Sequence, residues 1–236
     1  NVTGVQTCAL PICKIVGPGN AWVAAAKTLV SIDCPIDFQA GPSEIVICAD
    51  RGPAGWIAAD LIAQAEHDPR ARAILVTTKR SLANAVSAEV ERQMPATGPA
   101  KESIRRNGAL IVTRSARETV ELVNRLAPEH LVCDGGIPVD RFTAAGTIFL
   151  GAWTAQAAGD YCTGSNHVLP TGGAARFRGG LSASDFVRVF AVQTLTKAGL
   201  AKIGPAVIEL AEAEGLRGHA DSVRIRMGGR RAARRD

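Results

Sequence analysis

The chain has four histidines, and two of the segments that carry them combine residue types suited to binding a metal ion. Gln64 and His67 are three residues apart at the end of an expected helix, so they share one face and can point at one ion. Asp160 opens a glycine-containing loop that ends at His167. Zinc accepts imidazole nitrogen and carboxylate oxygen, and glycines let a backbone bend close to a ligand. These residues are therefore candidates for a metal site.

The same residues also allow a simpler interpretation. The histidines can lie on the surface or be hydrogen-bonded in the core, because neither an HExxH nor a CxxC pattern enforces a metal. Cys162 lies in the same loop as Asp160, and we interpret it as a buried apolar filler rather than a ligand. Spacing alone leaves the metal and structural interpretations open.

Glu129 and His130 place a carboxylate and an imidazole side by side just after an expected helix. Histidine titrates near neutral pH, and a buried glutamate can have a raised pKa, so the pair suits proton transfer. In the alternative interpretation, His130 only complements the dipole at the end of that helix. Local chemistry leaves both interpretations open.

The segment Gly17-Pro18-Gly19-Asn20 precedes another expected helix, whose free N–H groups could meet a phosphate. It is not the GxGxxG pattern of dinucleotide-binding loops. Local chemistry favours a plain turn with Asn20 as the N-cap.

Short apolar runs alternate with longer amphipathic runs from Lys14 onward, which indicates an α/β architecture that must position these residues. The expected strands are Glu44–Ala49, Ala73–Thr77, Ala109–Thr113 and Thr147–Leu150. The expected helices are Ala21–Val30, Trp56–Glu66, Lys79–Met94, Ala116–Leu126, Ser184–Ala191 and Pro205–Glu214, with Ser115 and Ser184 as N-caps. After about Gly180 the strand signals fade, which predicts a small helical tail.

Composition excludes two broad classes of protein. No apolar run approaches the roughly 20 residues of a membrane-spanning helix, so we expect a soluble chain with no membrane partner. The net charge of +5 owes much to arginines at the C-terminal end, and aromatic residues make up only 4%, so nucleic-acid binding is not expected. Six cysteines without a disulfide-type framework fit reduced thiols in a cytoplasm.

Six short motifs resemble, in order and spacing, those of histidinol dehydrogenases. They are Gly17–Asn20, Ala40–Glu44, Gln64–His67, Ala127–Leu131, Gly159–Asp160 and Ser165–Thr171. The resemblance covers about Lys14 to Arg226, and the combination is far more specific than any one motif. It implies NAD-linked, four-electron oxidation of L-histidinol to L-histidine through the aldehyde, the last steps of histidine biosynthesis.

The resemblance also implies a role for particular residues. Zinc would be held by Gln64, His67, Asp160 and His219. His130 would be the base for the alcohol step, and Glu129 would activate the water that attacks the aldehyde. Substrate contacts would include the four zinc ligands, His130, Ser43 and Glu214, and Asn20 would touch NAD. The family forms a homodimer whose C-terminal tail crosses over, so Glu214 and His219 would complete the partner's site.

The implied fold is an incomplete Rossmann-like parallel-sheet domain followed by a small helical C-terminal tail domain. We expect residues 14–42 to be a remnant of the NAD-binding domain, 43–180 the main α/β domain with the zinc and substrate site, 181–226 a helical dimerisation tail, and 227–236 a basic disordered tail. Residues 1–13 resemble a translated sequencing-adapter oligonucleotide and are excluded. The alternatives are a catalytically inactive zinc-binding fragment that lacks the NAD-binding half, and a zinc hydrolase.

Overall fold

A computed structural model describes residues 12–134 and 136–228 of the chain. The chain divides into two compact units, one ending at Val187 and the other beginning at Arg188. Parts of the expected N-terminal segment 1–13 and of the expected basic tail 227–236 lie outside the described residues. Within the described residues, no helix is long and apolar enough to cross a membrane.

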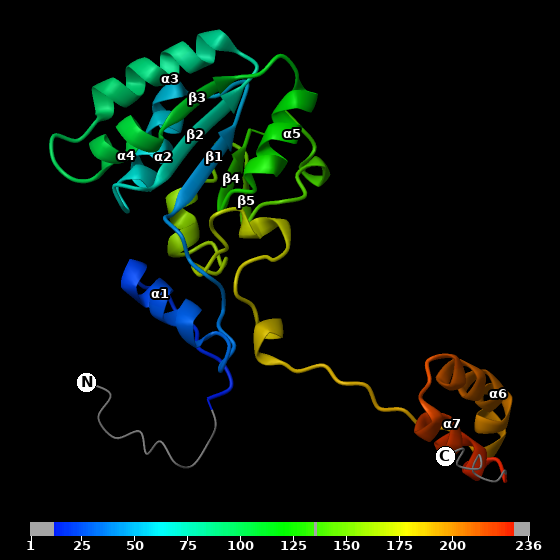
Figure 1. Ribbon diagram of the computed structural model, residues 1–236. Helices are drawn as coiled ribbons and strands as arrows, with labels where there is room; N and C mark the ends of the chain where they lie inside the picture. The colour runs from blue at the N-terminus through cyan, green and yellow to red at the C-terminus, as the bar shows by residue number, and fades with distance from the viewer. Residues whose placement is uncertain (1–11, 135, 229–236) are drawn as a thin grey trace, which may run out of the picture. The chain divides into compact units, whose positions relative to one another are not determined.

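The first unit is built around a five-stranded sheet in which all neighbouring strands are parallel, with the order β3-β2-β1-β4-β5 (Figure 1). The strands are β1 (Glu44–Cys48), β2 (Arg72–Thr77), β3 (Ala109–Val112), β4 (His130–Cys133) and β5 (Thr147–Leu150). Helices α2 (Ala54–Ala65), α3 (Arg80–Gln93), α4 (Ala100–Asn107) and α5 (Ala116–Leu126) connect the first four strands, and α1 (Ala21–Val30) precedes the sheet. This confirms the expected α/β fold with a parallel sheet.

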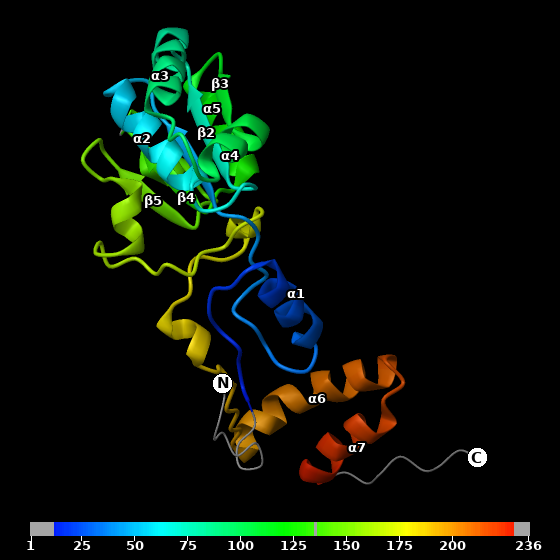
Figure 2. The ribbon, with the colours of Figure 1, turned by 90° about the vertical axis from the view of Figure 1, so that its left-hand side faces the viewer.

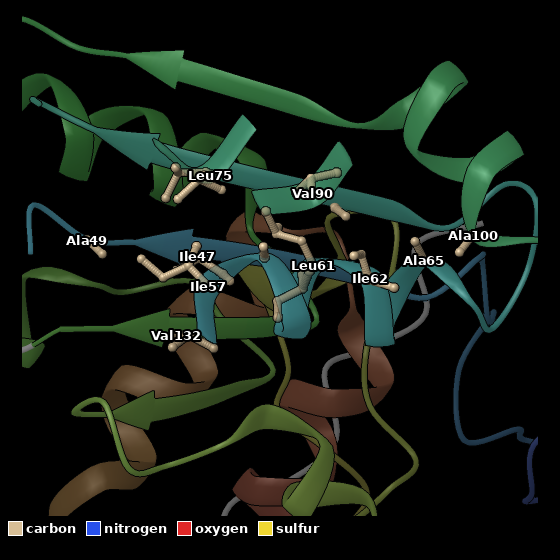
Figure 3. Close-up of a cluster of buried hydrophobic side chains, with 14 of the residues drawn as sticks. Ile47, Ala49, Ile57, Leu61, Ile62, Ala65, Leu75, Val90, Ala100 and Val132 are labelled. Carbon is tan, nitrogen blue, oxygen red and sulfur yellow. The ribbon is translucent and has the colours of Figure 1, made fainter. Parts of the chain in front are cut away.

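Alternation along β1 divides the core into two layers. Ile45 and Ile47 pack with residues of α2 and α3, including Leu61 and Val90, in the cluster drawn in Figure 3. On the opposite face, Val46 and Cys48 pack in a second cluster with Val123 of α5. All five residues of β1 are buried, as a central parallel strand covered by helices on both faces requires.

Local sequence explains how the chain enters β4. The Ser115 hydroxyl caps α5 by accepting a hydrogen bond from the Glu118 N–H, as predicted. The helix ends where Ala127 takes the left-handed conformation, with φ 49°, and Pro128 cannot continue a helix. The chain therefore turns directly into Glu129 and the first residue of β4.

The second unit contains α6 (Lys197–Ala213) and α7 (Arg217–Arg226), which form an antiparallel hairpin (Figure 2). The side chain of Thr196 caps α6, and Gly215, with φ 74°, makes the turn between the helices. The C-terminal helices confirm the expected helical tail.

Several expected elements differ from the structure. The expected helix Ser184–Ala191 is wrong: a short 3₁₀ turn spans Ala183–Phe186 with Ser182 as its cap, and the chain is not helical again until Lys197. Helix α6 begins at Lys197, so Pro205, expected at the start of a helix, lies inside it. The α-helices and strands of the described residues that the sequence did not predict are α4, α7 and β4.

The core predicts a graded loss of stability for two in-register leucines, Leu75 on β2 and Leu110 on the edge strand β3. Leu75 is 0% exposed and Leu110 is 37% exposed. We expect Leu75→Ala to lower the free energy of unfolding by about 3 kcal/mol, and Leu110→Ala by about 1 kcal/mol or less. Urea denaturation followed by circular dichroism measures both, and equal losses would contradict this description of the core.

Candidate active site

The strands β1 and β4 bring three ionisable residues together at the amino edge of the sheet. Their register pairs Ile45 with His130, so Glu44 lies opposite Glu129. The N–H of Glu44 donates a 2.9 Å hydrogen bond to Oε2 of Glu129, and both side chains are buried. His130 is the first residue of β4 and is also buried. It does not cap a helix, so the interpretation of His130 as a partner of the helix dipole is wrong.

Burial shifts the protonation of the Glu129–His130 pair. Burial, helped by the nearby carboxylates of Glu44 and Asp160 and opposed by the hydrogen bond from the Glu44 N–H, raises the pKa of Glu129 to about 8. Burial lowers the pKa of His130 to about 4, against the opposite effect of Asp160. Nδ1 of His130 lies 3.6 Å from Oε2 of Glu129. At neutral pH the pair therefore consists of a neutral imidazole beside a carboxyl group that can hold a proton.

Gln64, His67 and Asp160 line one cavity of about 130 Å³ in the first unit. Nε2 of His67 lies 3.9 Å from Oδ2 of Asp160, and Nε2 of His130 lies 3.9 Å from Oδ1 of the same carboxylate. Gln64 is fully buried near the end of α2, and neither atom of its carboxamide has a hydrogen-bond partner among the described residues. A buried amide without a partner is costly, so a missing ligand is its simplest explanation.

The side chains that line the cavity include donor groups of the kinds that bind a divalent cation. No group of three or more His, Cys, Asp or Glu side chains in residues 12–134 and 136–228 is arranged to hold a metal ion. Gln64, His67 and Asp160 nevertheless offer an amide oxygen, an imidazole and a carboxylate toward one cavity. Zinc accepts or tolerates all three kinds of ligand. The Gln64 oxygen, which has no hydrogen-bond partner among the described residues, is available to a metal ion.

The other residues predicted for the site fall in three places. Ser43 lines the same cavity. Asn20 caps α1 by accepting hydrogen bonds from the N–H groups of Trp22 and Val23, as local chemistry favoured, and it is not among the residues that line the cavity. Glu214 and His219 are exposed residues of the second unit, at the end of α6 and in the first turn of α7. Their contribution to the site remains a prediction.

A buried ion pair holds the Gly17–Asn20 loop beside the cavity. Nζ of Lys27 pairs with Asp37 and donates a 2.9 Å hydrogen bond to the carbonyl of Gly17. The N–H of Gly17 donates to Oδ2 of Asp37 at 2.9 Å. Burial by itself raises the pKa of Asp37, but hydrogen bonds from Lys27, Gly17 and Phe38 outweigh it and lower the pKa. Gly17 has φ 127°, which explains the glycine at this turn.

His167, a candidate ligand from its place in the loop of Asp160, lines the cavity, although the family resemblance implied no role for it. Its Nδ1 lies 3.0 Å from Oδ1 of Asp160. Its place seven residues after Asp160, at the end of the same glycine-containing loop, was the signal available in the sequence. The expectation for Cys162 is wrong, because this cysteine is exposed rather than a buried filler.

At the carboxyl edge of the sheet, where α/β proteins usually bind nucleotides, hydrogen bonds to internal carboxylates join the loops that follow β1, β2 and β4. Oδ2 of Asp134 accepts hydrogen bonds from the N–H groups of Asp50 and Arg51, at 2.9 and 3.2 Å. The Asp50 carboxylate in turn accepts from the N–H and the hydroxyl of Thr78, both at 2.6 Å. Internal carboxylates thus occupy the loop donors that a pyrophosphate would need, and they would repel its charge.

Comparisons with curated proteins and with solved structures both find histidinol dehydrogenases. The chain is 45% identical over 228 residues to a histidinol dehydrogenase of Legionella pneumophila, covering 92% of this chain and 53% of that protein. It is 48% identical over 224 residues to the histidinol dehydrogenase of Brucella suis, covering 92% and 52%. The crystal structure of histidinol dehydrogenase from Elizabethkingia anophelis matches with a TM-score of 0.84 and 36% identity, over 91% of this chain and 51% of that one.

The chain thus spans about half the length of the relatives it matches. The agreement nevertheless extends over nearly all of the chain, because a family model described as histidinol dehydrogenase matches residues 3–227. That range contains every residue assigned above to the cavity and to its proton-transfer pair. The chain belongs to the histidinol dehydrogenase family.

Proposed function

We propose that this chain supplies the zinc- and substrate-binding part of a cytoplasmic histidinol dehydrogenase, which oxidises L-histidinol to L-histidine with NAD. Membership of the family supports the reaction class. The observation that carries the proposal is the buried, unpartnered carboxamide of Gln64, which lines one cavity with His67 and Asp160. A purely structural amide at this position would be expected to have hydrogen-bond partners.

Gln64, His67 and Asp160 would hold the zinc ion, with His219 as the fourth ligand. Zinc, when bound, would anchor the imidazole and amine of histidinol beside the proton-transfer pair. Nδ1 of His167 lies 3.0 Å from Oδ1 of Asp160, within reach of a hydrogen bond that the carboxylate accepts, and so restrains the orientation of that carboxylate. Ser43, which lines the same cavity, would contact substrate.

His130 and Glu129 would move the protons. The neutral imidazole of His130 can accept the proton of the substrate hydroxyl at Nε2, the ring nitrogen nearer Asp160. In its ionised form, which becomes the major form above a pH of about 8 in the zinc-free chain, Glu129 would take the proton of the water that attacks the aldehyde. Its Oε2 is held by the N–H of Glu44, which restricts how the carboxyl group can turn. Burial of both side chains excludes bulk water from this exchange of protons.

A homodimer would complete the site. Glu214 and His219 are exposed on either side of the Gly215 turn, at the same end of the α6–α7 hairpin. We propose that this end of the hairpin enters the site of a partner subunit, with Glu214 contacting substrate and His219 binding zinc. NAD is the hydride acceptor of the family, and Asn20, the N-cap of α1, is its proposed contact in this chain.

Zinc binding is the first test. We expect His67→Ala to weaken zinc affinity beyond the roughly 10- to 100-fold that loss of an outer-shell partner costs, because it removes a direct ligand. Competition with a chromogenic chelator measures the affinity. Cys162→Ala is the control, since it removes an exposed soft ligand from the loop that carries Asp160. Zinc affinity that depends on Cys162 and not on His67 would contradict the assigned ligands.

The second prediction concerns turnover. Dialysed chain supplied with zinc, NAD and histidinol should form little or no NADH, because the side-chain oxygen of Asn20, its proposed NAD contact, is already engaged in capping α1. Calorimetry should still detect histidinol binding by the zinc-loaded chain. Steady NADH formation would show that this chain contains a sufficient cofactor site. Hydrolytic turnover without NAD would support the alternative zinc hydrolase.

Protonation of the catalytic pair predicts how the stability of the zinc-free chain varies with pH. Between the ordinary pKa of 4.5 and about 8, the folded chain keeps a proton on Glu129 that the unfolded chain has released, so stability falls as pH rises. Between about 4 and 6.5, His130 has the opposite effect, because the unfolded chain holds the extra proton. The Glu129 effect is therefore isolated between about pH 6.5 and 8.

We expect the free energy of unfolding to fall in that window by up to about 1.4 kcal/mol per pH unit. Glu129→Gln should remove the fall, because an amide does not ionise. Urea denaturation in the presence of a chelator measures the slope, and Glu121→Gln, on the exposed face of α5, should leave it unchanged. An unaltered slope in Glu129→Gln would mean that Glu129 is not protonated in the folded chain.

A further inference from the structure

Glu44 is a buried carboxylate for which the proposed reaction has no use. It begins β1, whose other residues are Ile45, Val46, Ile47 and Cys48, and it is 6% exposed. A charge at the start of a central buried strand is costly unless it is paired and hydrogen-bonded. Its partners should therefore show what the carboxylate does.

One partner comes from the wall of the cavity. The N–H of Gly172 donates a 2.9 Å hydrogen bond to Oε1 of Glu44, across 128 residues of sequence. Beside it, the N–H of Gly41 donates to Oγ1 of Thr171 at 2.5 Å. His167, Val168, Leu169 and Thr171, which precede Gly172, line the cavity with Gln64 and Asp160. The two bonds thus attach the end of this wall to the segment that leads into β1.

The other partners lie on the neighbouring strands. Oε2 of Glu44 is 3.6 Å from Nη1 of Arg72, its register partner on β2, whose side chain is largely exposed. The N–H of Glu44 holds Oε2 of Glu129, the proposed activator of water. Glu44 therefore links Glu129 to the cavity wall, through its N–H on one side and its carboxylate on the other.

We propose that Glu44 is a positioning residue for the histidinol site. Its side chain is long enough for the carboxylate to reach the Gly172 N–H and so to hold the wall segment 167–172 against the amino edge of the sheet. The inference rests on the proposed function for its link to histidinol. A different role would be purely electrostatic, since the charge of Glu44 lies close to Glu129. Substitutions can separate the effect of side-chain length from the effect of charge.

Glu44→Asp keeps the charge but shortens the side chain by one methylene, so its carboxylate should no longer reach the Gly172 N–H. Glu44→Gln keeps the length and an acceptor oxygen but removes the charge. Hydrogen exchange of residues 168–173, measured on the zinc-free chain, reports the wall itself. Calorimetry with histidinol, measured on the zinc-loaded chain, reports the site.

We expect Glu44→Asp to speed exchange of residues 168–173 about tenfold and to weaken histidinol binding about tenfold, the effect of losing one hydrogen bond to a charged group. Glu44→Gln should stay within about twofold of the unaltered chain in both measurements. Ser103→Ala is the control, because it removes another buried tether, from Ser103 Oγ to the carbonyl of Ala71 at 2.9 Å, away from the cavity. It should change neither measurement.

Three results would overturn the proposal. Glu44→Asp could leave exchange unchanged, Glu44→Gln could loosen the wall as much as Glu44→Asp, or Ser103→Ala could loosen it equally. If the unaltered zinc-loaded chain fails to bind histidinol, the proposed function fails. The exchange measurement still decides the role of Glu44 in that case, because it needs neither zinc nor substrate.

Discussion

The pairing of β1 with β4 is the constraint on which the site depends. Parallel register sets Glu44 opposite Glu129 and Ile45 opposite His130, so the proton-transfer pair is fixed by backbone hydrogen bonds of two central strands. A slip of one residue would turn every side chain of β4 to the other face of the sheet. The buried apolar residues of β1 and β4 oppose such a slip, because both clusters of the core would lose their contacts.

The two edges of the sheet have different chemistry. At the carboxyl edge, Asp134 and Asp50 accept hydrogen bonds from loop amides and hydroxyls, so internal carboxylates take the place of a phosphate. At the amino edge, the carboxamide of Gln64 and both ring nitrogens of His130 are buried without hydrogen-bond partners in the described part of the chain. Polar groups left unpaired in a cavity are suited to a ligand, whereas those at the carboxyl edge are already satisfied. The proposed site therefore lies at the amino ends of the strands, whereas α/β proteins usually bind nucleotides at the carboxyl ends.

Much of the fold follows from local sequence, and the exceptions have physical causes. Helices α1 and α5 have the predicted bounds because Asn20 and Ser115 are strong caps. Strand β4 was missed because it begins with His130, an ionisable residue that is atypical of a buried strand. The helix expected over Ser184–Ala191 does not form beyond Phe186, where β-branched Val187 and Val189 favour extended backbone.

Only part of the candidate site could be predicted from the sequence. Gln64, His67 and Asp160 could be selected through the resemblance to a family, and they do line one cavity. The tether from Glu44 to Gly172 could not be predicted, because it joins residues 128 positions apart and follows no periodic pattern. The exposure of Cys162 depends on the path of its loop, which no local rule fixes.

The most direct test of the account is anomalous diffraction at the zinc edge from crystals of the zinc-loaded chain. The account predicts one peak in the cavity at the amino edge, about 2.0 to 2.2 Å from a nitrogen of His67 and an oxygen of Asp160, with Oε1 of Gln64 turned toward it. A peak only elsewhere, or a cavity without zinc at saturating metal, would contradict the claim that these side chains form one metal site.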